Sequence, residues 1–264
     1  MADELLSESD GVAHRLTVNR PARCNALTPA LARRIAEEID RVGALGQSRA
    51  ILLSGAGGHF SAGLDLHWLP SLGVAPPLAA LQRGLHDFQS VILAIVRSPL
   101  PVIALLPGTA AGFGLDLALA CDIRLAARSA TFTSAFARMG LVPDGGSTFT
   151  LPFLIGPGRA LRFLLTNETL DADAACRAGL VDAVTEDAEL EAEADALVAR
   201  IAASAESSVH TIKRLSRASE LGGLEQALAA EGAAQLQALQ SDEFRRRLTA
   251  FVARTGARAG APSA

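Results

Sequence analysis

A single carboxylate stands in a long stretch of the chain that otherwise contains no acidic residue. Between Ser129 and Gly158 the only acid is Asp144, in the sequence VPDGG, and its neighbours are mostly apolar. An aspartate in such a place can cap the helix that follows it. A carboxylate in an apolar pocket, however, has a raised pKa and is a stronger base than it would be in water. From the residues alone, both roles are open for Asp144.

Two glycine-rich turns have a similar composition, and each follows a short apolar run. They are GGHFSAGLDL and GTAAGFGLDLAL, at residues 57–66 and 108–119. Small residues let the backbone approach a ligand, and outward-pointing amides can hold an oxygen that becomes anionic, as a thioester oxygen does on enolisation. The second turn opens a helix, whose N-terminus adds positive charge. Both could equally be tight turns that strand–helix packing requires. Asp116, in the first turn of that helix, either complements the helix dipole or takes part in proton transfer.

Several other kinds of chemistry lack their motifs. There is no P-loop, no nucleophile elbow, and no acid placed to complete a dinucleotide turn. The three cysteines lie far apart, so we expect neither a disulfide framework nor a metal site. A net charge of −4 argues against nucleic-acid binding. Lys213 is the only lysine, so the positive charge is almost all arginine, which suits phosphate or carboxylate recognition.

The elements that must position these residues alternate between strand and helix. Strand patterns at 12–19, 50–58 and 102–108 are separated by helical patterns at 31–42 and 76–98. This alternation predicts an α/β core with parallel strands. After about Leu151 the pattern becomes mainly helical. We expect a core over residues 1–200 and a helical C-terminal region over 201–264. The polar N-terminus and the lack of a long apolar run predict a cytoplasmic protein without a membrane span.

Several separated blocks of sequence together resemble the crotonase (enoyl-CoA hydratase/isomerase) superfamily. They follow one another with the family's spacing over roughly 12–251, and they are NRPARCNAL, GHFSAGLDL, PLPVIALLPGTAAGFGLDLALACDIRLAARSATF, MGLVPDGGS and TNETLDADAACRAGLVDAV. The resemblance implies a ClpP-like spiral of ββα turns and a helical C-terminal part that forms trimers or hexamers. It also implies acyl-CoA substrates, such as those of fatty acid metabolism, and no metal or redox cofactor.

The resemblance also assigns binding residues. The oxyanion hole would be the backbone N–H groups of Leu64 and Phe113, where Phe113 replaces the usual glycine. The coenzyme A and substrate contacts would come from two loops and one aromatic residue: Arg23, Cys24, Ala26, Ala62, Asp65, Leu66 and Phe136. Arg247, Arg254 and Lys213 are candidates for the coenzyme A phosphates.

The acids decide between reactions. Hydratases of this family use two glutamates, and this chain has Asp116 at one position and Phe136 at the other, so the pair is incomplete. Asp144 stands where isomerases of the phenylacetate-pathway type place a lone acid. We therefore expect 3-enoyl-CoA to 2-enoyl-CoA isomerisation, with Asp144 moving the proton.

Three alternatives remain open at this point. One is hydration through Asp116, with or without Asp144. A second is a reaction like that of 4-chlorobenzoyl-CoA dehalogenase, although Gln89 replaces its histidine and His86 lies one helical turn earlier. The third is a non-catalytic acyl-CoA binder.

Overall fold

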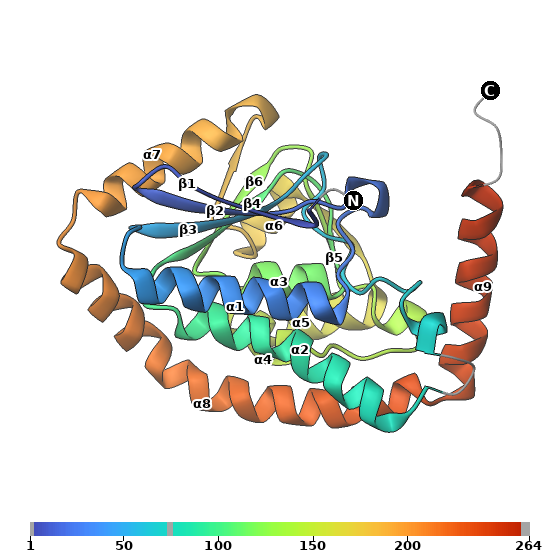
Figure 1. Ribbon diagram of the computed structural model, residues 1–264. Coiled ribbons are helices and arrows are strands. Elements are labelled where there is room, and N and C mark those ends of the chain that lie inside the picture. The colour runs from blue at the N-terminus through green and yellow to red at the C-terminus, as the bar shows by residue number, and fades with distance from the viewer. Residues whose placement is uncertain (1–2, 73–75, 260–264) are drawn as a thin grey trace.

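A twisted sheet with helices on both faces forms the centre of the molecule. The computed structural model describes residues 3–72 and 76–259, drawn in colour in Figure 1. The main sheet has six strands in the order β1-β2-β3-β4-β6-β9, and every neighbouring pair except β1–β2 is parallel. Their bounds are Leu5–Ser9, Ala13–Val18, Ala50–Gly55, Val102–Leu106, Ile123–Ala127 and Ala183–Thr185.

A smaller sheet of three strands, β5-β7-β8, stands beside the main one. These strands span Ala110–Ala111, Thr131–Thr133 and Thr169–Asp171. The long helices are α1, α2, α8 and α9, at Pro29–Leu45, Leu78–Arg97, Glu206–Leu239 and Asp242–Ala259. The shorter ones are α3, α4, α5, α6 and α7, at Phe113–Ala120, Ser147–Ile155, Pro157–Thr166, Ala172–Ala178 and Leu190–Ala202. Among the described residues, none of these helices has both the length and the apolar character needed to cross a membrane.

The strands of the main sheet read as continuous apolar runs because both faces are covered. In β3, Ile51 and Leu53 belong to the core under α1, α2 and α3, whereas Leu52 belongs to a second core that is closed by α7. Figure 1 shows these two layers on opposite sides of the strands. The predicted parallel α/β core is therefore confirmed. Strand β1, which pairs antiparallel with β2, was not predicted, because its residues are mostly polar and exposed.

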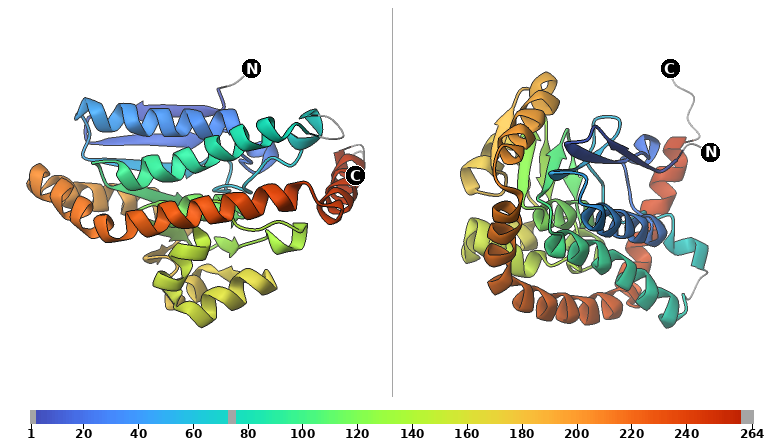
Figure 2. Two further views of the ribbon diagram at one scale, coloured as in Figure 1. Left: turned by 90° about the horizontal axis from the view of Figure 1, so that it is seen from below. Right: turned by 60° about the vertical axis from the view of Figure 1, so that its left-hand side comes forward.

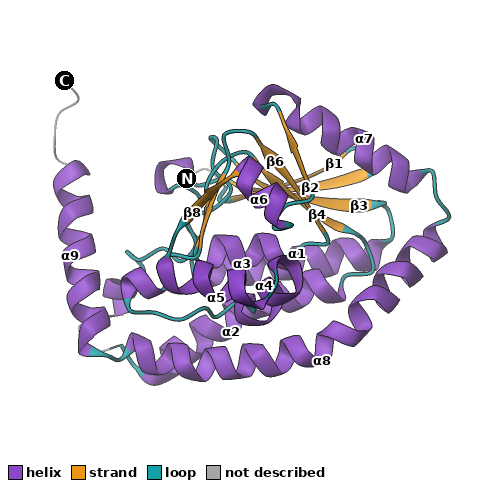
Figure 3. Cartoon of the chain, turned by 180° about the vertical axis from the view of Figure 1, so that it is seen from behind, coloured by secondary structure: helices purple, strands orange, loops and turns teal. Residues whose placement is uncertain are grey.

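Helix α8 is a single helix of 34 residues that continues through Gly222 and Gly223. It runs between α2 on one side and α4 on the other (Figure 2). A side chain at Gly223 would lie 2.6 Å from the ring of Phe149 in α4, and one at Gly232 would lie 2.9 Å from Leu85 in α2. Glycine at these two positions therefore lets α8 approach both neighbours. Helix α9 then turns away at one end of the molecule (Figure 3).

Candidate active site

The two glycine turns lie side by side because they follow β3 and β4, which are parallel neighbours in the sheet. Ser61 bridges to Ala110, and the Ala111 amide donates to the Ser61 carbonyl at 2.9 Å. Gly63 adopts φ +85°, and a Cβ there would lie 2.7 Å from the Ala111 carbonyl. Only glycine fits between the turns at this distance, so a glycine is required at position 63 for the two turns to meet.

The family resemblance assigns an oxyanion hole to the backbone amides of Leu64 and Phe113, and this assignment stays a prediction. Both residues line one cavity, and in the described part of the chain neither amide donates a hydrogen bond to the protein. Phe113 is also the first residue of α3, where the helix dipole favours negative charge. Its bulky ring finds room under α2, packed edge-on against Phe88 at 4.6 Å. The side chain therefore leaves its amide accessible from the cavity.

This cavity encloses about 100 Å³ and is almost entirely apolar. Asp144 and Gln235 are the only polar side chains among the described residues that line it. The others are Ala62, Leu64, Leu66, Phe88, Gly112, Phe113, Ala135, Phe136, Met139 and Leu141. Phe136 therefore forms part of the wall at the position where a family hydratase would place an acid. No second carboxylate lines this cavity in the part of the chain that the structure describes.

Asp144 is 8% exposed, and its two carboxylate oxygens have different surroundings. Oδ2 accepts a hydrogen bond from Gln235 Nε2 at 3.2 Å, whereas Oδ1 is buried and has no hydrogen-bond partner among the described residues. Burial raises the pKa of Asp144 to about 7, the negative charge of Glu231 adds to this increase, and the Gln235 hydrogen bond opposes it. A base with this pKa is half ionised near neutral pH, the range in which general acid–base catalysis is most effective.

The alternative in which Asp144 caps the following helix is wrong. The N-cap residue of helix α4 is Gly146, which has no side chain that could form a capping hydrogen bond. Glu231 from α8 does this instead, accepting from the amides of Gly146 at 2.7 Å and Thr148 at 2.9 Å. The carboxylate of Asp144 is therefore not occupied by a capping role.

Asp116 is 1% exposed and lies behind the loop of Asp144 rather than at the cavity. Its Oδ2 accepts from the Gly145 amide at 3.0 Å, and its Oδ1 has no partner. Burial first, and then the charges of Glu231 and Asp144, raise its pKa well above the ordinary value. In residues 3–72 and 76–259, no three histidine, cysteine, aspartate or glutamate side chains are arranged to hold a metal ion.

The two loops assigned to coenzyme A lie together in the structure. The Ala62 amide donates to the Cys24 carbonyl at 2.9 Å, and Leu27 bridges to Leu64. Cys24 is exposed and Ala26 is buried. Ala62 and Leu66 line the cavity, but Asp65 does not, because its carboxylate pairs with Arg20 at 2.9 Å. Whether these residues bind coenzyme A stays a prediction.

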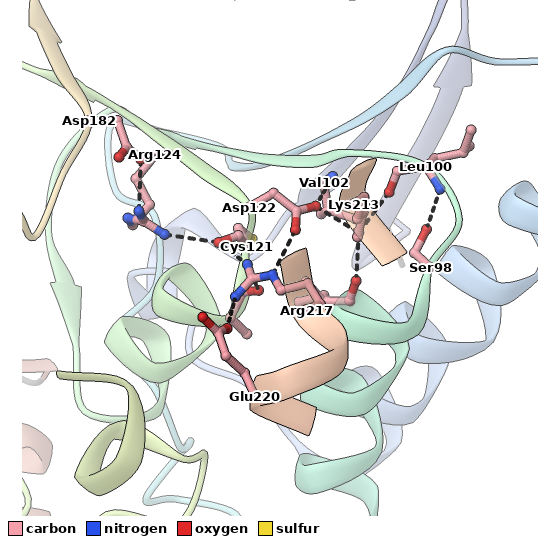
Figure 4. A network of polar contacts seen from close by, with 12 residues as sticks. Ser98, Leu100, Val102, Cys121, Asp122, Arg124, Asp182, Lys213, Arg217 and Glu220 are labelled. Atoms are coloured by element: carbon pink, nitrogen blue, oxygen red, sulfur yellow. Dashed lines mark hydrogen bonds and ion pairs between the residues drawn. The ribbon is translucent and has the colours of Figure 1, made fainter. Parts of the chain in front are cut away.

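Of the cations proposed for the coenzyme A phosphates, Lys213 is wrongly assigned. It is 8% exposed, and its ammonium group contacts Asp122 at 2.7 Å and the carbonyls of Ile95 and Leu100 (Figure 4). Its donors are therefore used inside the core. Asp122 also pairs with Arg217 at 3.1 Å. Arg254 is exposed, and Arg247 pairs with Glu243 on the same helix.

Sequence reasoning missed two residues of the site, Glu231 and Gln235. Both are buried on α8, about ninety positions from the residues that they contact. The only local signal was an acid within the small and apolar run QALAAEGAAQLQAL. The histidine expected of a dehalogenase is also missing: His86 is exposed, and the Gln89 amide donates to the Asp144 and Leu228 carbonyls.

Comparison with known proteins gives a consistent result. Residues 7–258 match the family model described as enoyl-CoA hydratase/isomerase. A probable enoyl-CoA hydratase of Rhodobacter capsulatus is 36% identical over 92% of both chains. A 1,2-epoxyphenylacetyl-CoA isomerase of Escherichia coli is 33% identical over 96% of this chain and 97% of that one. The crystal structure of an enoyl-CoA hydratase from Bacillus halodurans superposes with a TM-score of 0.88 at 27% identity, covering 94% of this chain and all of that one. The family resemblance and the fold predicted from the sequence are both confirmed.

Proposed function

The chain belongs to the enoyl-CoA hydratase/isomerase family, and from this premise we propose that it moves the double bond of an enoyl-CoA thioester from C3–C4 to C2–C3. The observation that carries this proposal is that Asp144 is the only ionisable side chain among the described residues lining the cavity. Double-bond migration needs one group that removes a proton and returns it, whereas hydration needs a water molecule held between two such groups. Phe136 stands where the second group would be.

Each step has a residue to perform it. Oδ1 of Asp144, which has no protein partner, removes a proton from C2, and the electron pair of that C–H bond enters the thioester as a dienolate. The amides of Leu64 and Phe113 stabilise the negative oxygen, in an apolar site where such hydrogen bonds are strong. The protonated Asp144 then returns the proton to C4, so that the double bond lies between C2 and C3 and the carboxylate is regenerated.

The apolar lining of the cavity, which includes the rings of Phe88, Phe113 and Phe136, favours an apolar acyl group. We further propose that the enzyme acts as a trimer or hexamer. Large apolar side chains are exposed on α4, α5 and α8, and exposed apolar surface of this kind marks contact between chains. They are Phe153, Leu161, Leu165, Ile212 and Leu215. A cytoplasmic location stays a prediction from the sequence.

The test is a matched pair of assays on the wild type and Asp144→Ala, one with a short 3-enoyl-CoA and one with the 2-enoyl-CoA of the same length. We expect isomerisation of the first substrate to fall by about two orders of magnitude or more, mainly in kcat. Asp173→Ala is a suitable control, because Asp173 forms an exposed ion pair with Arg128. If Asp144→Ala still hydrated the 2-enoyl-CoA, the catalytic acid would be Asp116 rather than Asp144. Binding without any turnover by the wild type would favour the pure binder.

A further inference from the structure

One turn of α8 lies directly against the loop that carries Asp144. Glu231 and Gln235 are four residues apart, so their side chains emerge from the same face of the helix. They are 6% and 2% exposed, although most of their polar neighbours on this helix face solvent. A buried glutamate and a buried glutamine need polar partners, and both find them in the segment 142–148.

The hydrogen bonds of these two side chains reach every second residue of that segment. Gln235 accepts from the Val142 amide at 3.1 Å and donates to Asp144 Oδ2 at 3.2 Å. Glu231 accepts from the amides of Gly146 and Thr148, and also from the Thr148 hydroxyl at 2.5 Å. The segment 142–148, which includes the start of α4, is therefore fixed at four residues by one helix that lies far away in the sequence.

This arrangement controls which oxygen of Asp144 is available. The Gln235 hydrogen bond holds Oδ2, so the carboxylate cannot rotate freely and Oδ1 stays without a protein partner. Glu231 meanwhile satisfies the amides at the start of α4, which Asp144 would otherwise be well placed to cap. A base held in one orientation reacts faster than one that must first find it.

We propose that Glu231 and Gln235 are positioning residues, which hold the loop of Asp144 and keep its Oδ1 directed at the substrate. This inference rests on the proposed function of Asp144. It adds that α8 is a working part of the site and not only a support for the fold.

The two residues also act on the charge of Asp144 in opposite directions. The carboxylate of Glu231 raises the pKa of Asp144, whereas the hydrogen bond from Gln235 lowers it. The other charged group close to this pair is Asp116 on α3, and no cation lines the cavity among the described residues. A purely structural role would not produce opposite changes in the pH dependence of the rate.

The experiment measures kcat/KM for a short 3-enoyl-CoA across pH in Glu231→Gln and Gln235→Met, both close in shape to the original residue. The rate rises with pH as Asp144 ionises. We expect this rise to move to lower pH in Glu231→Gln and to higher pH in Gln235→Met, by about half a pH unit or more each. We also expect the maximal kcat to fall by about tenfold in both, because the base is less well held.

Glu225→Gln and Gln237→Met are matched controls on exposed positions of the same helix, and both should behave as the wild type. Glu231→Asp, which keeps the charge, should leave the rise near its original pH and provides a second variant if Glu231→Gln folds poorly. The inference would be overturned if the rise in kcat/KM moved in the same direction in Glu231→Gln and Gln235→Met. It would also be overturned if both variants were active and the rise stayed at its original pH in both. If Asp144→Ala itself keeps full activity, the proposed function fails first, and the two failures can be told apart.

Discussion

Helix α3 has an aspartate near each end, and both lie close to α8, but their surroundings are opposite. Asp122, just beyond the C-terminal end, is paired with two cations from α8. Asp116, in the first turn, has two other carboxylates as its charged neighbours, Asp144 and Glu231. The same pair of helices therefore holds one compensated charge cluster and one uncompensated cluster.

The compensated cluster joins α8 to the core, as Figure 4 shows. Lys213 contacts one oxygen of Asp122 at 2.7 Å, and Arg217 contacts the other at 3.1 Å. Arg217 also donates to the carbonyl of Cys121 at 3.0 Å, at the C-terminal end of α3 where the helix dipole favours a cation. Each polar atom that is taken from water has a partner, so the cluster fixes α8 in place at little expense in stability.

The uncompensated cluster of Asp116, Asp144 and Glu231 is unfavourable for folding. It lies beside the cavity in which we expect the proton transfer to take place. Oδ1 of Asp116 and Oδ1 of Asp144 both lack partners, and burial raises the pKa of both groups. A group kept in this state is a better proton acceptor once it ionises. The two clusters differ in their position: charge is paired where α8 is attached to the core, and it is left unpaired beside the cavity where we propose that Asp144 reacts.

The largest expected effect comes from breaking the compensated cluster. In Asp122→Asn the shape is retained, but Lys213 loses its counter-ion and Arg217 keeps only Glu220. We expect a loss of about 3 kcal/mol in the free energy of unfolding at pH 7, measured by urea denaturation, because a buried charge without its partner is strongly destabilising.

The pH dependence of this loss provides a check. Burial already lowers the pKa of Lys213, and Asp122 opposes that effect. Without Asp122 the pKa falls further, so the folded protein binds fewer protons than the unfolded one and its stability rises with pH. The loss should therefore be smaller at pH 10 than at pH 7. Glu220→Gln is the control, since this exposed partner of Arg217 should change stability by less than about 1 kcal/mol.

A smaller effect of opposite sign is expected from the uncompensated cluster. The pKa of Asp144 is about 7 in the folded protein and 3.8 ordinarily, so between these values the folded state binds more protons and its stability falls as pH rises. Asp144→Asn does not titrate. We expect it to stabilise the protein by about 2 kcal/mol at pH 8 and by much less at pH 5, while activity is lost.

Urea denaturation at the two pH values measures this gain. A variant that is less stable than the wild type at pH 8 would mean that the Asp144 carboxylate is compensated in the folded protein. Asp173→Asn, at an exposed ion pair, should show no comparable gain at either pH.

Much of this could be predicted from the sequence, because the signals are local. Apolar runs identified the buried parallel strands, and the isolation of Asp144 singled out the acid at the cavity. The glycine turns indicated where outward-pointing amides would lie, and the family resemblance then assigned them to Leu64 and Phe113. The remainder depends on contacts between distant segments. The sequence cannot show that α8 returns to the loop of Asp144, so Glu231 and Gln235 were missed and Lys213 was placed at the surface.

The central claim is that Asp144, and not Asp116, removes the substrate proton. It is tested most directly by the exchange of the C2 proton of a short 3-enoyl-CoA with solvent deuterium, followed by NMR in Asp144→Asn and Asp116→Asn side by side. We predict that exchange falls by about a hundredfold or more in Asp144→Asn, whereas Asp116→Asn, which can still accept from the Gly145 amide, loses less than about tenfold. Exchange that persists in Asp144→Asn and disappears in Asp116→Asn would contradict the account.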